Sequence, residues 1–469
     1  MEIKLTFLGA AQNVTGSCYL LEADDYKILI DCGLYQEREF KDRNFEPFFI
    51  LPKEIDAIIL THAHLDHCGR IPLLVQKGFK GKIYSTSATL DIAKIVLVDS
   101  AKIQKEDARY KRKRHEKEGR KSPFPIVPLY TKEDVEKTLP LFNSVKYGLD
   151  NKISENLTIK YHEAGHILGS ASVEIAINQN GDIKKILFSG DMGRWDKPIL
   201  EDPEFACNAD YIVCESTYGN RIHDKVDDIK EKLLEVITKT YEKNGNIIIP
   251  SFAIERSQEL LYFLGELKNE KKIPNLSIFL DSPMAVSVTE VFKKHPEMFD
   301  EQMLEKIKQG KSPLDAHGLF MAKTTKQSKA LNTLKGTSII IAGSGMCTGG
   351  RIKHHLLNNI SNPNNSILFV GYQASGTLGR IILDKPDEVR ILGQIKKIRS
   401  SIYKISGFSA HADQNELLKW LSNISEKPKK LFITHGEPES SKAFEKAVRK
   451  NLSWDTYIPN YKDTFDLTY

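Results

Sequence analysis

The stretch Thr61-His62-Ala63-His64-Leu65-Asp66-His67 places four metal-binding side chains within six residues. It follows the apolar run 55–60, which predicts a buried strand, and it precedes residues 69–74, whose pattern predicts a helix. Imidazole and carboxylate groups held at close spacing between two rigid elements suit a metal ion with a preferred ligand geometry. Three of the chain's 13 histidines lie here, so we interpret the stretch as a metal-binding loop rather than a polar loop with chance histidines.

The length and composition indicate a globular protein of more than one domain. At 469 residues the chain exceeds the usual single-domain size, so we expect two domains or one domain with a large insertion. The six cysteines lack zinc-finger spacing, and no apolar stretch is long enough to cross a membrane. With no leader pattern at the N-terminus, these features favour a cytoplasmic location without a membrane partner, and a metal held by His and Asp.

The charge of the chain is concentrated in one segment. The formal net charge of +5 is mild, but residues 111–121, KRKRHEKEGRK, hold seven basic and two acidic side chains. They lie at the polar end of a helix predicted to begin near Ala88. Such a patch can attract phosphate backbones, and a solvated helix end is the open alternative.

The strand pattern divides the chain into two kinds of structure. Residues 1–32 alternate like an antiparallel meander that ends at Asp31, which is a candidate to orient a ligand histidine or, equally, a turn residue. Helices are then expected to alternate with strands to about residue 210. From about residue 226, repeated strand, glycine loop and helix predict a second, parallel α/β unit.

Further strand ends carry metal-binding or acidic residues, namely His166, Asp191, Glu215 and His435, and a loop near residue 410 carries His411. Layered α/β folds gather functional loops at one edge of their sheets, so we expect the strand-end ligands to meet the opening motif. Seven candidate ligands are too many for one tetrahedral zinc and suit two ions that share a bridging carboxylate. These are His62, His64, Asp66, His67, His166, Asp191 and His435, of which Asp191 has the isolated position of a bridge.

Two such ions can bind one hydroxide between them and stabilise both oxygens of an in-line displacement. This arrangement suits phosphodiester hydrolysis, and it also suits amide or thioester hydrolysis. The metal site alone therefore leaves the substrate open.

The motif set resembles that of the metallo-β-lactamase superfamily, through residues 62–67 with Asp31, His166 and Asp191. Glu215, Ser409-Ala410-His411-Ala412-Asp413 and Thr434-His435-Gly436-Glu437 resemble the further motifs of its nucleic-acid-processing branch, the β-CASP family. The similarity covers nearly the whole chain. The motif set most resembles that of compact bacterial and archaeal relatives of the endonuclease that cleaves pre-mRNA before polyadenylation.

The resemblance implies an α/β fold, a metallo-β-lactamase αβ/βα sandwich with an inserted parallel α/β β-CASP domain. The sandwich would comprise residues 1–216 and 394–469, and the β-CASP domain residues 217–393. By the same resemblance, two Zn2+ ions are bound, one by His62, His64 and His166 and the other by Asp66, His67 and His435, with Asp191 as the bridge. His411 would protonate the leaving 3′ oxygen, and Glu215 would position it.

The implied function is a zinc-dependent ribonuclease that uses a metal-bridging hydroxide and leaves a 5′-phosphate on single-stranded RNA. We expect endonuclease activity, with 5′-exonuclease activity and a homodimer left open. His435 resembles the RNA-cleaving members, because members that act on DNA tend to have an apolar residue there. The alternatives are a catalytically silent processing subunit and a small-molecule metallohydrolase; the complete ligand set argues against the first and the insert against the second.

Contacts to RNA phosphates are expected from a glycine-rich loop. Residues 343–351, GSGMCTGGR, follow a predicted strand and precede a helix, so their backbone N–H groups could hold a phosphate, although a tight turn is the simpler alternative. The candidates are Ser344, Gly345, Ser409 and Arg256. Cys68, beside the ligands, is expected to serve packing.

Overall fold

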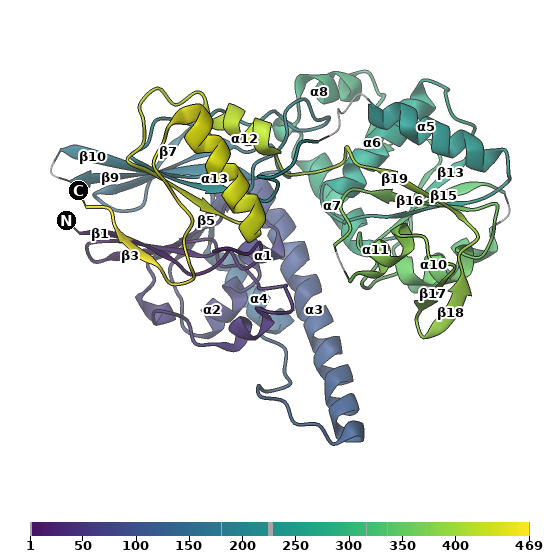
Figure 1. Cartoon of the computed structure of the whole chain (residues 1–469), viewed down its shortest axis with the longest axis horizontal. Coiled ribbons are helices and arrows are strands. Elements are labelled where there is room, and N and C mark those ends of the chain that lie inside the picture. The colour runs from purple at the N-terminus through teal and green to yellow at the C-terminus, as the bar shows by residue number, and fades with distance from the viewer. Residues whose placement is uncertain are drawn as a thin grey trace. The chain divides into compact units, whose positions relative to one another are not determined.

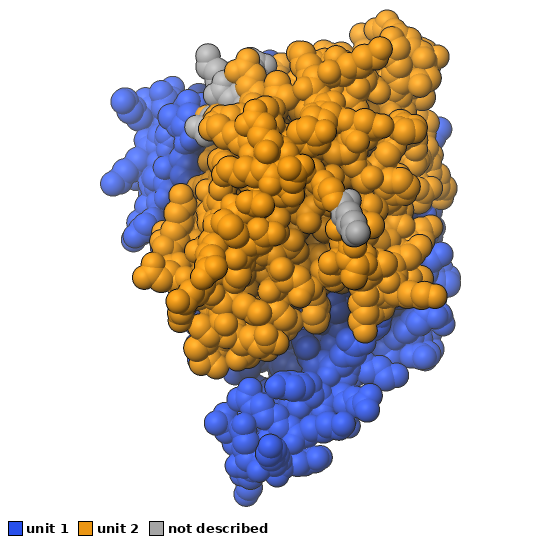
Figure 2. All heavy atoms as spheres, turned by 90° about the vertical axis from the view of Figure 1, so that its right-hand side faces the viewer, with its two compact units in different colours: residues 1–195, 202–222, 411–469 blue, residues 196–201, 223–410 orange. Residues whose placement is uncertain are grey.

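The computed structural model describes residues 2–179, 181–223, 228–315, 317–334, 336–374 and 376–468. They form two compact units, which Figure 2 distinguishes by colour. Unit 1 comprises residues 1–195, 202–222 and 411–469, and unit 2 comprises residues 196–201 and 223–410. Each unit has its own sheets and its own hydrophobic core.

The first sheet of unit 1 has the strand order β22-β1-β2-β3-β4-β5-β6. Its strands β1, β2 and β3 form the predicted antiparallel meander, and β3 to β6 pair in parallel. The bounds are β1 Ile3–Phe7, β2 Tyr19–Ala23, β3 Tyr26–Ile30, β4 Ala57–Ile59, β5 Lys82–Thr86, β6 Phe142–Val145 and β22 Thr464–Asp466.

The second sheet has the order β21-β20-β11-β10-β9-β8-β7. The bounds are β7 Asp150–Lys152, β8 Leu157–Glu163, β9 Ala171–Gln179, β10 Asp182–Phe188, β11 Tyr211–Glu215, β20 Lys430–Thr434 and β21 Thr456–Tyr457. Strands β7 to β10 pair antiparallel, so the expected alternation of helices and strands up to about residue 210 is wrong for residues 142–188. Along β8 burial alternates residue by residue, the pattern of a strand with only one face in the core.

The two sheets pack face to face around one core. That core joins residues of both sheets, including Phe7, Ile59, Val173, Phe188 and Phe432. Helices α12 (Gln414–Leu421) and α13 (Pro438–Leu452) bury Trp420 and Phe444 against the outer face of the second sheet. Helices α1 (Leu65–Cys68), α2 (Ile71–Gln76), α3 (Ser87–Glu118) and α4 (Lys132–Thr138) accompany the first sheet (Figure 1). Unit 1 is therefore the predicted αβ/βα sandwich.

The opening motif departs in one respect from the predicted loop. Residues 65–68 form the one-turn helix α1, because the carbonyl oxygen of His64 accepts hydrogen bonds from the backbone N–H groups of His67 and Cys68. Asp66 and His67 therefore project from a helical turn, whereas His62 and His64 precede it. The predicted helix 69–74 is α2, with Pro72 in its first turn, where a missing N–H costs nothing.

Helix α3 is the longest helix described, at 32 residues. Its last buried residue is Ala108, and its far end extends beyond the sheets of unit 1 (Figure 1). The chain comes back to the inner part of α3 at Tyr130, which is buried and donates its hydroxyl to Ser100 Oγ at 3.0 Å. The backbone N–H of Leu129 donates to Gln104 Oε1 at 2.9 Å. Residues 109–128 therefore form an extension, because hydrogen bonds from residues 129 and 130 to α3 join its two ends. The basic residues 111–121 lie on the far part of this extension.

Unit 2 is built on a parallel sheet with the order β14-β13-β15-β12-β16-β19, as predicted. Strands β12, β15 and β16 are buried along their whole length, the pattern of a sheet covered on both faces. The strands are β12 Ile247–Pro250, β13 Ser277–Leu280, β14 Leu319–Met321, β15 Ser338–Ala342, β16 Ser366–Val370 and β19 Ser401–Ile405, with the hairpin β17 Glu388–Ile391 and β18 Gln394–Lys397.

The helices of unit 2 follow these strands. They are α5 Asp228–Tyr241, α6 Arg256–Asn269, α7 Pro283–Lys294, α8 Glu301–Lys308, α9 Thr325–Ala330, α10 Ile352–Asn359 and α11 Leu378–Leu383. Short 3-10 helices occur in both units, at Lys41–Phe45, Pro52–Glu54, Leu139–Leu141, Pro296–Met298, Pro313–Asp315 and Leu331–Thr333. Helix α5 lies at the start of the second α/β unit expected from about residue 226, and residues 224–227 lie outside the described part of the chain.

The limits of the compact units differ from the domain limits expected from the sequence. Strand β19 pairs with β16, so residues 394–410 group with unit 2 and the return to unit 1 comes at residue 411 rather than 394. Residues 196–201 also group with unit 2. The limits at 217 and 394 therefore remain predictions about domains. None of the described helices has the length and apolar character needed to cross a bilayer.

Thr86 couples the start of α3 to the loop that carries His166. Its hydroxyl donates to the carbonyl of Gly169 at 2.7 Å and accepts from the N–H of Thr89 at 3.2 Å. We expect Thr86→Val to lower the free energy of unfolding of unit 1 by about 1–3 kcal/mol, because a helix cap and a buried bond are lost. Thr86→Ser keeps the hydroxyl and should stay close to the wild type.

Urea unfolding followed by tryptophan fluorescence measures this effect, since all three tryptophans, Trp195, Trp420 and Trp454, lie in unit 1. Equal destabilisation by the serine and valine variants would contradict the role given to the hydroxyl.

Candidate metal centre

The first cluster of ligand atoms joins the opening motif to the loops after β8 and β10. His64 Nδ1 lies 3.1 Å from His62 Nε2 and 3.1 Å from His166 Nε2. Asp191 Oδ2 lies 3.4 Å from His62 Nε2 and 3.6 Å from His166 Nε2. These four side chains form one group that could hold an ion.

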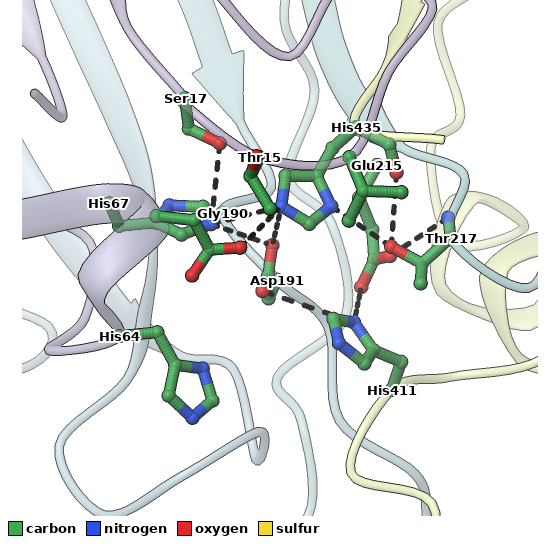
Figure 3. Close-up of polar contacts among 12 residues, drawn as sticks. Thr15, Ser17, His64, His67, Gly190, Asp191, Glu215, Thr217, His411 and His435 are labelled. Atoms are coloured by element: carbon green, nitrogen blue, oxygen red, sulfur yellow. Dashed lines mark hydrogen bonds and ion pairs between the residues drawn. The ribbon is translucent and has the colours of Figure 1, made fainter. Parts of the chain in front are cut away.

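The second cluster lies on the other side of Asp191. His67 Nε2 is 3.2 Å from His435 Nε2, and Asp66 Oδ2 is 3.6 Å from His435 Nε2. Asp191 Oδ1 is 3.2 Å from His67 Nε2 and 3.5 Å from His435 Nε2. Figure 3 shows Asp191 between His67 and His435. All seven ligands expected from the sequence therefore meet in unit 1.

The spacing of these atoms fits two metal ions. An ion bound at about 2.0–2.2 Å in tetrahedral geometry separates its ligand atoms by about 3.3–3.6 Å. The two oxygens of Asp191 face different clusters, as a bridging carboxylate requires. Asp191 Oδ1 is buried and accepts no hydrogen bond, although a charged oxygen in that position needs a partner. A cation on each side of Asp191 would satisfy this need.

Asp31 and Thr61 orient two of the ligand histidines. Asp31 Oδ2 lies 2.6 Å from His67 Nδ1, and the Thr61 hydroxyl donates to the same carboxylate oxygen at 2.9 Å. Thr61 Oγ1 is also 3.1 Å from His62 Nδ1. A proton on each Nδ1 makes these bonds and leaves the Nε2 lone pair for an ion. Asp31 thus has the orienting position expected of it, and it connects both clusters.

Thr217 orients a third ligand, His435. Thr217 Oγ1 lies 2.9 Å from His435 Nδ1 and 3.0 Å from the carbonyl oxygen of the same residue. The hydroxyl can therefore accept from the imidazole while it donates to the carbonyl. Neither Thr61 nor Thr217 was identified from the sequence as part of the site; the only signal was a hydroxyl beside the motif and beside the acidic strand end.

Burial and charge set the protonation of the ligands. Burial lowers the pKa of His62 to about 3 and that of His64 to about 4, so both are neutral at pH 7 and can bind a metal. Burial also lowers the pKa of His435, but the charge of Asp191 and the contact with Asp66 outweigh it and raise the value to about 9. A metal ion binds the neutral imidazole, so binding at the second cluster competes with protonation and releases protons.

His411 lies beside the clusters and is not one of the seven ligands. Its Nδ1 is 3.1 Å from Glu215 Oε1 and 3.9 Å from Asp191 Oδ2 (Figure 3). Glu215 is buried, and its carboxylate also accepts from the backbone N–H groups of Met192 at 2.7 Å and Thr217 at 3.2 Å. These bonds fix the carboxylate, which in turn holds the imidazole. The side chain of His411 is 20% exposed, so it is accessible to a substrate.

The charges around His411 favour its protonated form. Burial lowers its pKa, but the nearby carboxylates of Glu215 and Asp191 outweigh burial and raise it above the usual value. An imidazole that is protonated near neutral pH can act as a general acid.

The residues expected to contact phosphate all belong to unit 2. They are Arg256, Ser344, Gly345 and Ser409, the last of which lies two residues before His411 in the sequence. Arg256 is buried and donates to the carbonyl of Val370 at 2.9 Å, and Ser344 Oγ accepts from the N–H of Gly349 at 3.2 Å, inside its own loop. Phosphate binding by these residues stays a prediction. Cys68 is fully buried, consistent with packing.

We expect Thr217→Val to weaken metal binding at the second cluster by about 10–100-fold, because the bond that orients His435 is lost. Thr217→Ser retains the hydroxyl and should bind metal like the wild type. Competition with a chromophoric chelator measures the affinities. Loss in both variants, or in neither, would show that the hydroxyl does not orient His435.

Sequence models of known domain families match most of the chain. They are the Metallo-beta-lactamase superfamily domain over residues 20–200, the Beta-Casp domain over 257–382, and the Zn-dependent metallo-hydrolase RNA specificity domain over 395–459. Among solved structures, a protein of unknown function from Enterococcus faecalis aligns over 100% of both chains with a TM-score of 0.56 and 13% identity, which supports the fold alone.

Three relatives match along nearly the whole of this chain. Ribonuclease TTHA0252 of Thermus thermophilus is 38% identical, with 95% of this chain and 96% of the relative covered. The RNase J-like protein of Methanocaldococcus jannaschii is 30% identical, with 97% and 98% covered. The transcription termination factor FttA of the same organism is 32% identical, with 97% and 70% covered. Together with the donor set of the metal centre, these matches show that the chain belongs to the β-CASP ribonuclease family of the metallo-β-lactamase superfamily and is a metal-dependent hydrolase.

Proposed function

We propose that the chain is a two-zinc ribonuclease that hydrolyses single-stranded RNA and leaves a 5′-phosphate. The observation that supports it most is the His411–Glu215 pair beside a carboxylate whose two oxygens face two sets of ligands. Two zinc ions in these clusters would supply a hydroxide nucleophile and neutralise the charge of the phosphate. Relatives called ribonuclease and RNase J-like support RNA as the substrate.

His411 and Glu215 together supply the proton that the leaving group takes up. Glu215 holds Nδ1–H of His411, so the second nitrogen, Nε2, is the one that gives its proton to the substrate. The nucleophile adds to phosphorus, the bond to the 3′ oxygen breaks, and that oxygen takes the proton from His411. The products are a 5′-phosphate and a 3′-hydroxyl. The hydrogen bond to Glu215 stabilises the imidazolium before transfer.

The distal part of α3 is proposed to attract RNA. Residues 111–121 carry seven basic and two acidic side chains, which gives them a net charge of 7 − 2 = +5, equal to that of the whole chain. Arg114 and Arg120 share Glu118 as an ion-pair partner, and Lys111, Arg112 and Lys113 are exposed. A cationic arm of this kind binds phosphate backbones without regard to sequence. Endonuclease activity with possible 5′-exonuclease activity, a homodimer and a cytoplasmic location remain predictions from the sequence.

His411 and His64 separate proton transfer from metal binding. His411→Ala should lower the rate of RNA cleavage by about 100-fold or more and leave the metal content unchanged, because its role is general acid. His64→Ala should lose both metal and cleavage. Metal analysis and cleavage of labelled single-stranded RNA measure the two effects. If His411→Ala lost metal, its assignment as an acid would be wrong.

The end groups and lengths of the RNA fragments test both the products of cleavage and the choice between endonuclease and 5′-exonuclease activity. RNA labelled at the 5′ or 3′ end, incubated with the zinc-loaded protein, should give fragments with a 5′-phosphate and a 3′-hydroxyl. Internal fragments in both labelled series indicate an endonuclease, and mononucleotides released from the 5′ end indicate a 5′-exonuclease. Intact RNA beside hydrolysis of a small ester would contradict the proposed function.

The basic arm is tested through salt dependence. Neutralising Lys111, Lys113 and Lys117 to Gln should raise KM for RNA and reduce the slope of log affinity against log salt by about 0.7 for each lost phosphate contact. The matched control neutralises Lys442, Lys446 and Lys450 on α13, which are also exposed and also in unit 1. Equal changes in both triple variants would show that the arm has no special role.

A further inference from the structure

A further group of side chains that could hold a metal ion lies in unit 1, outside the seven candidate catalytic ligands. It consists of His162, Glu174 and Cys207, whose ligand atoms all lie within 4.8 Å of one another. Cys207 Sγ is 2.9 Å from Glu174 Oε2, and His162 Nε2 is 3.9 Å from the same oxygen. The three residues come from β8, β9 and the segment that precedes β11, so they are brought together only by the fold.

His162 is oriented as a metal ligand would be. Its Nδ1 lies 3.0 Å from Glu204 Oε2, which can accept the proton on that nitrogen and leave the lone pair on Nε2. Nε2 is buried and has no hydrogen-bond partner, although it faces Glu174 and Cys207. An imidazole nitrogen without a partner, beside a thiol and a carboxylate, is unusual in a purely structural cluster.

Glu174 is likewise held with one oxygen available. Lys185 Nζ lies 2.9 Å from Oε1, whereas Cys207 and His162 both face Oε2. The lysine therefore fixes the carboxylate without occupying the oxygen that points into the cluster. The side chain of Glu174 is only 10% exposed, so its geometry is restricted.

The segment that carries Cys207 is tied down on both sides. The N–H of Ala206 donates to the carbonyl of Trp420 at 3.3 Å, and the N–H of Asp210 donates to the carbonyl of Lys185 at 2.9 Å. Asn208 lies 2.9 Å from Ser425 Oγ. The thiol is therefore held over the outer face of the second sheet before any ligand arrives, which lowers the entropy cost of binding.

We propose that His162, Glu174 and Cys207 form a third metal site, for a single Zn2+ ion, separate from the two catalytic ones. Thiolate, imidazole and carboxylate together select zinc or a similar transition metal and disfavour Mg2+ and Ca2+, which prefer oxygen ligands. The ion takes the place of the thiol proton, which leaves to solvent. Its role is to fasten residues 202–210 to strands β8 and β9.

The protonated thiol of Cys207 makes it necessary to test this site with excess metal. Burial and the carboxylate of Glu174 raise the pKa of Cys207 to about 12, so the thiol keeps its proton at neutral pH until an ion displaces it. Occupancy should therefore increase with pH.

Cobalt(II) gives a test that the catalytic site cannot imitate. The catalytic ligands are all His and Asp, so a thiolate-to-cobalt charge-transfer band in the near ultraviolet can arise only where a cysteine binds the ion. Titration of the full chain with cobalt(II) chloride should produce this band together with one bound ion beyond the catalytic ones. The band should be lost in Cys207→Ser and in His162→Gln, and retained in His64→Ala.

Controls separate this proposal from folding and from the proposed ribonuclease function. Cys207→Ser and His162→Gln should keep the circular-dichroism spectrum and the RNA cleavage rate of the wild type, so a loss of the band reports the third site alone. Absence of the band in the wild type, or its persistence in His162→Gln, would overturn the proposal. Either result would leave the catalytic assignment intact.

Discussion

The bridging position of Asp191 is the constraint on which the rest of unit 1 depends. A carboxylate that is 1% exposed, with one oxygen facing each cluster, is stable only when positive charge lies on both sides of it. Three separate segments, those after β4, β8 and β20, must deliver imidazole nitrogens to the Asp191 carboxylate, which follows β10, within about 0.5 Å of the required geometry. The sandwich achieves this because β4, β8, β10 and β20 belong to two sheets that share one core, so that a shift of either sheet would move ligands of both clusters.

The hydrogen bonds behind the ligands connect the two clusters a second time. Asp31 and Thr61 serve His62 of one cluster and His67 of the other. Glu215 and Thr217 are two residues apart in the sequence. Thr217 positions His435, and Glu215 positions His411. Ligand orientation and proton donation are therefore governed by neighbouring residues at the end of β11. This proximity explains how a small change at one strand end could affect both metal binding and proton transfer.

The sequence was sufficient to predict the class of fold and the side chains that meet in two clusters, and it failed where tertiary geometry decides. Histidine spacing and strand ends pointed to the seven candidate ligands that the fold brings together, because apolar runs and metal-binding side chains are local signals. The one-turn helix α1 was missed because four residues carry no periodicity. Thr61 and Thr217 were not predicted, because a hydroxyl orients a histidine only when the fold brings the two side chains together. Asp31 and His435 both adopt a positive φ, of 59° and 48° respectively, which changes the direction of their side chains. The residue type alone does not predict this backbone conformation. The antiparallel pairing of strands β7 to β10 was not predicted, because alternating apolar and polar residues are compatible with several strand orders.

The extension formed by the far end of α3 has a further consequence. Ser100 with Tyr130 and Gln104 with Leu129 close it at its base, and beyond Ala108 the helix buries nothing in the core. The free energy of the sandwich is therefore almost independent of what lies beyond that closure. A segment with this property can be lengthened, shortened or recharged over evolution at little cost to the fold. It gives the chain a place where its reach towards a polyanion can change while the chemistry at Asp191 stays fixed.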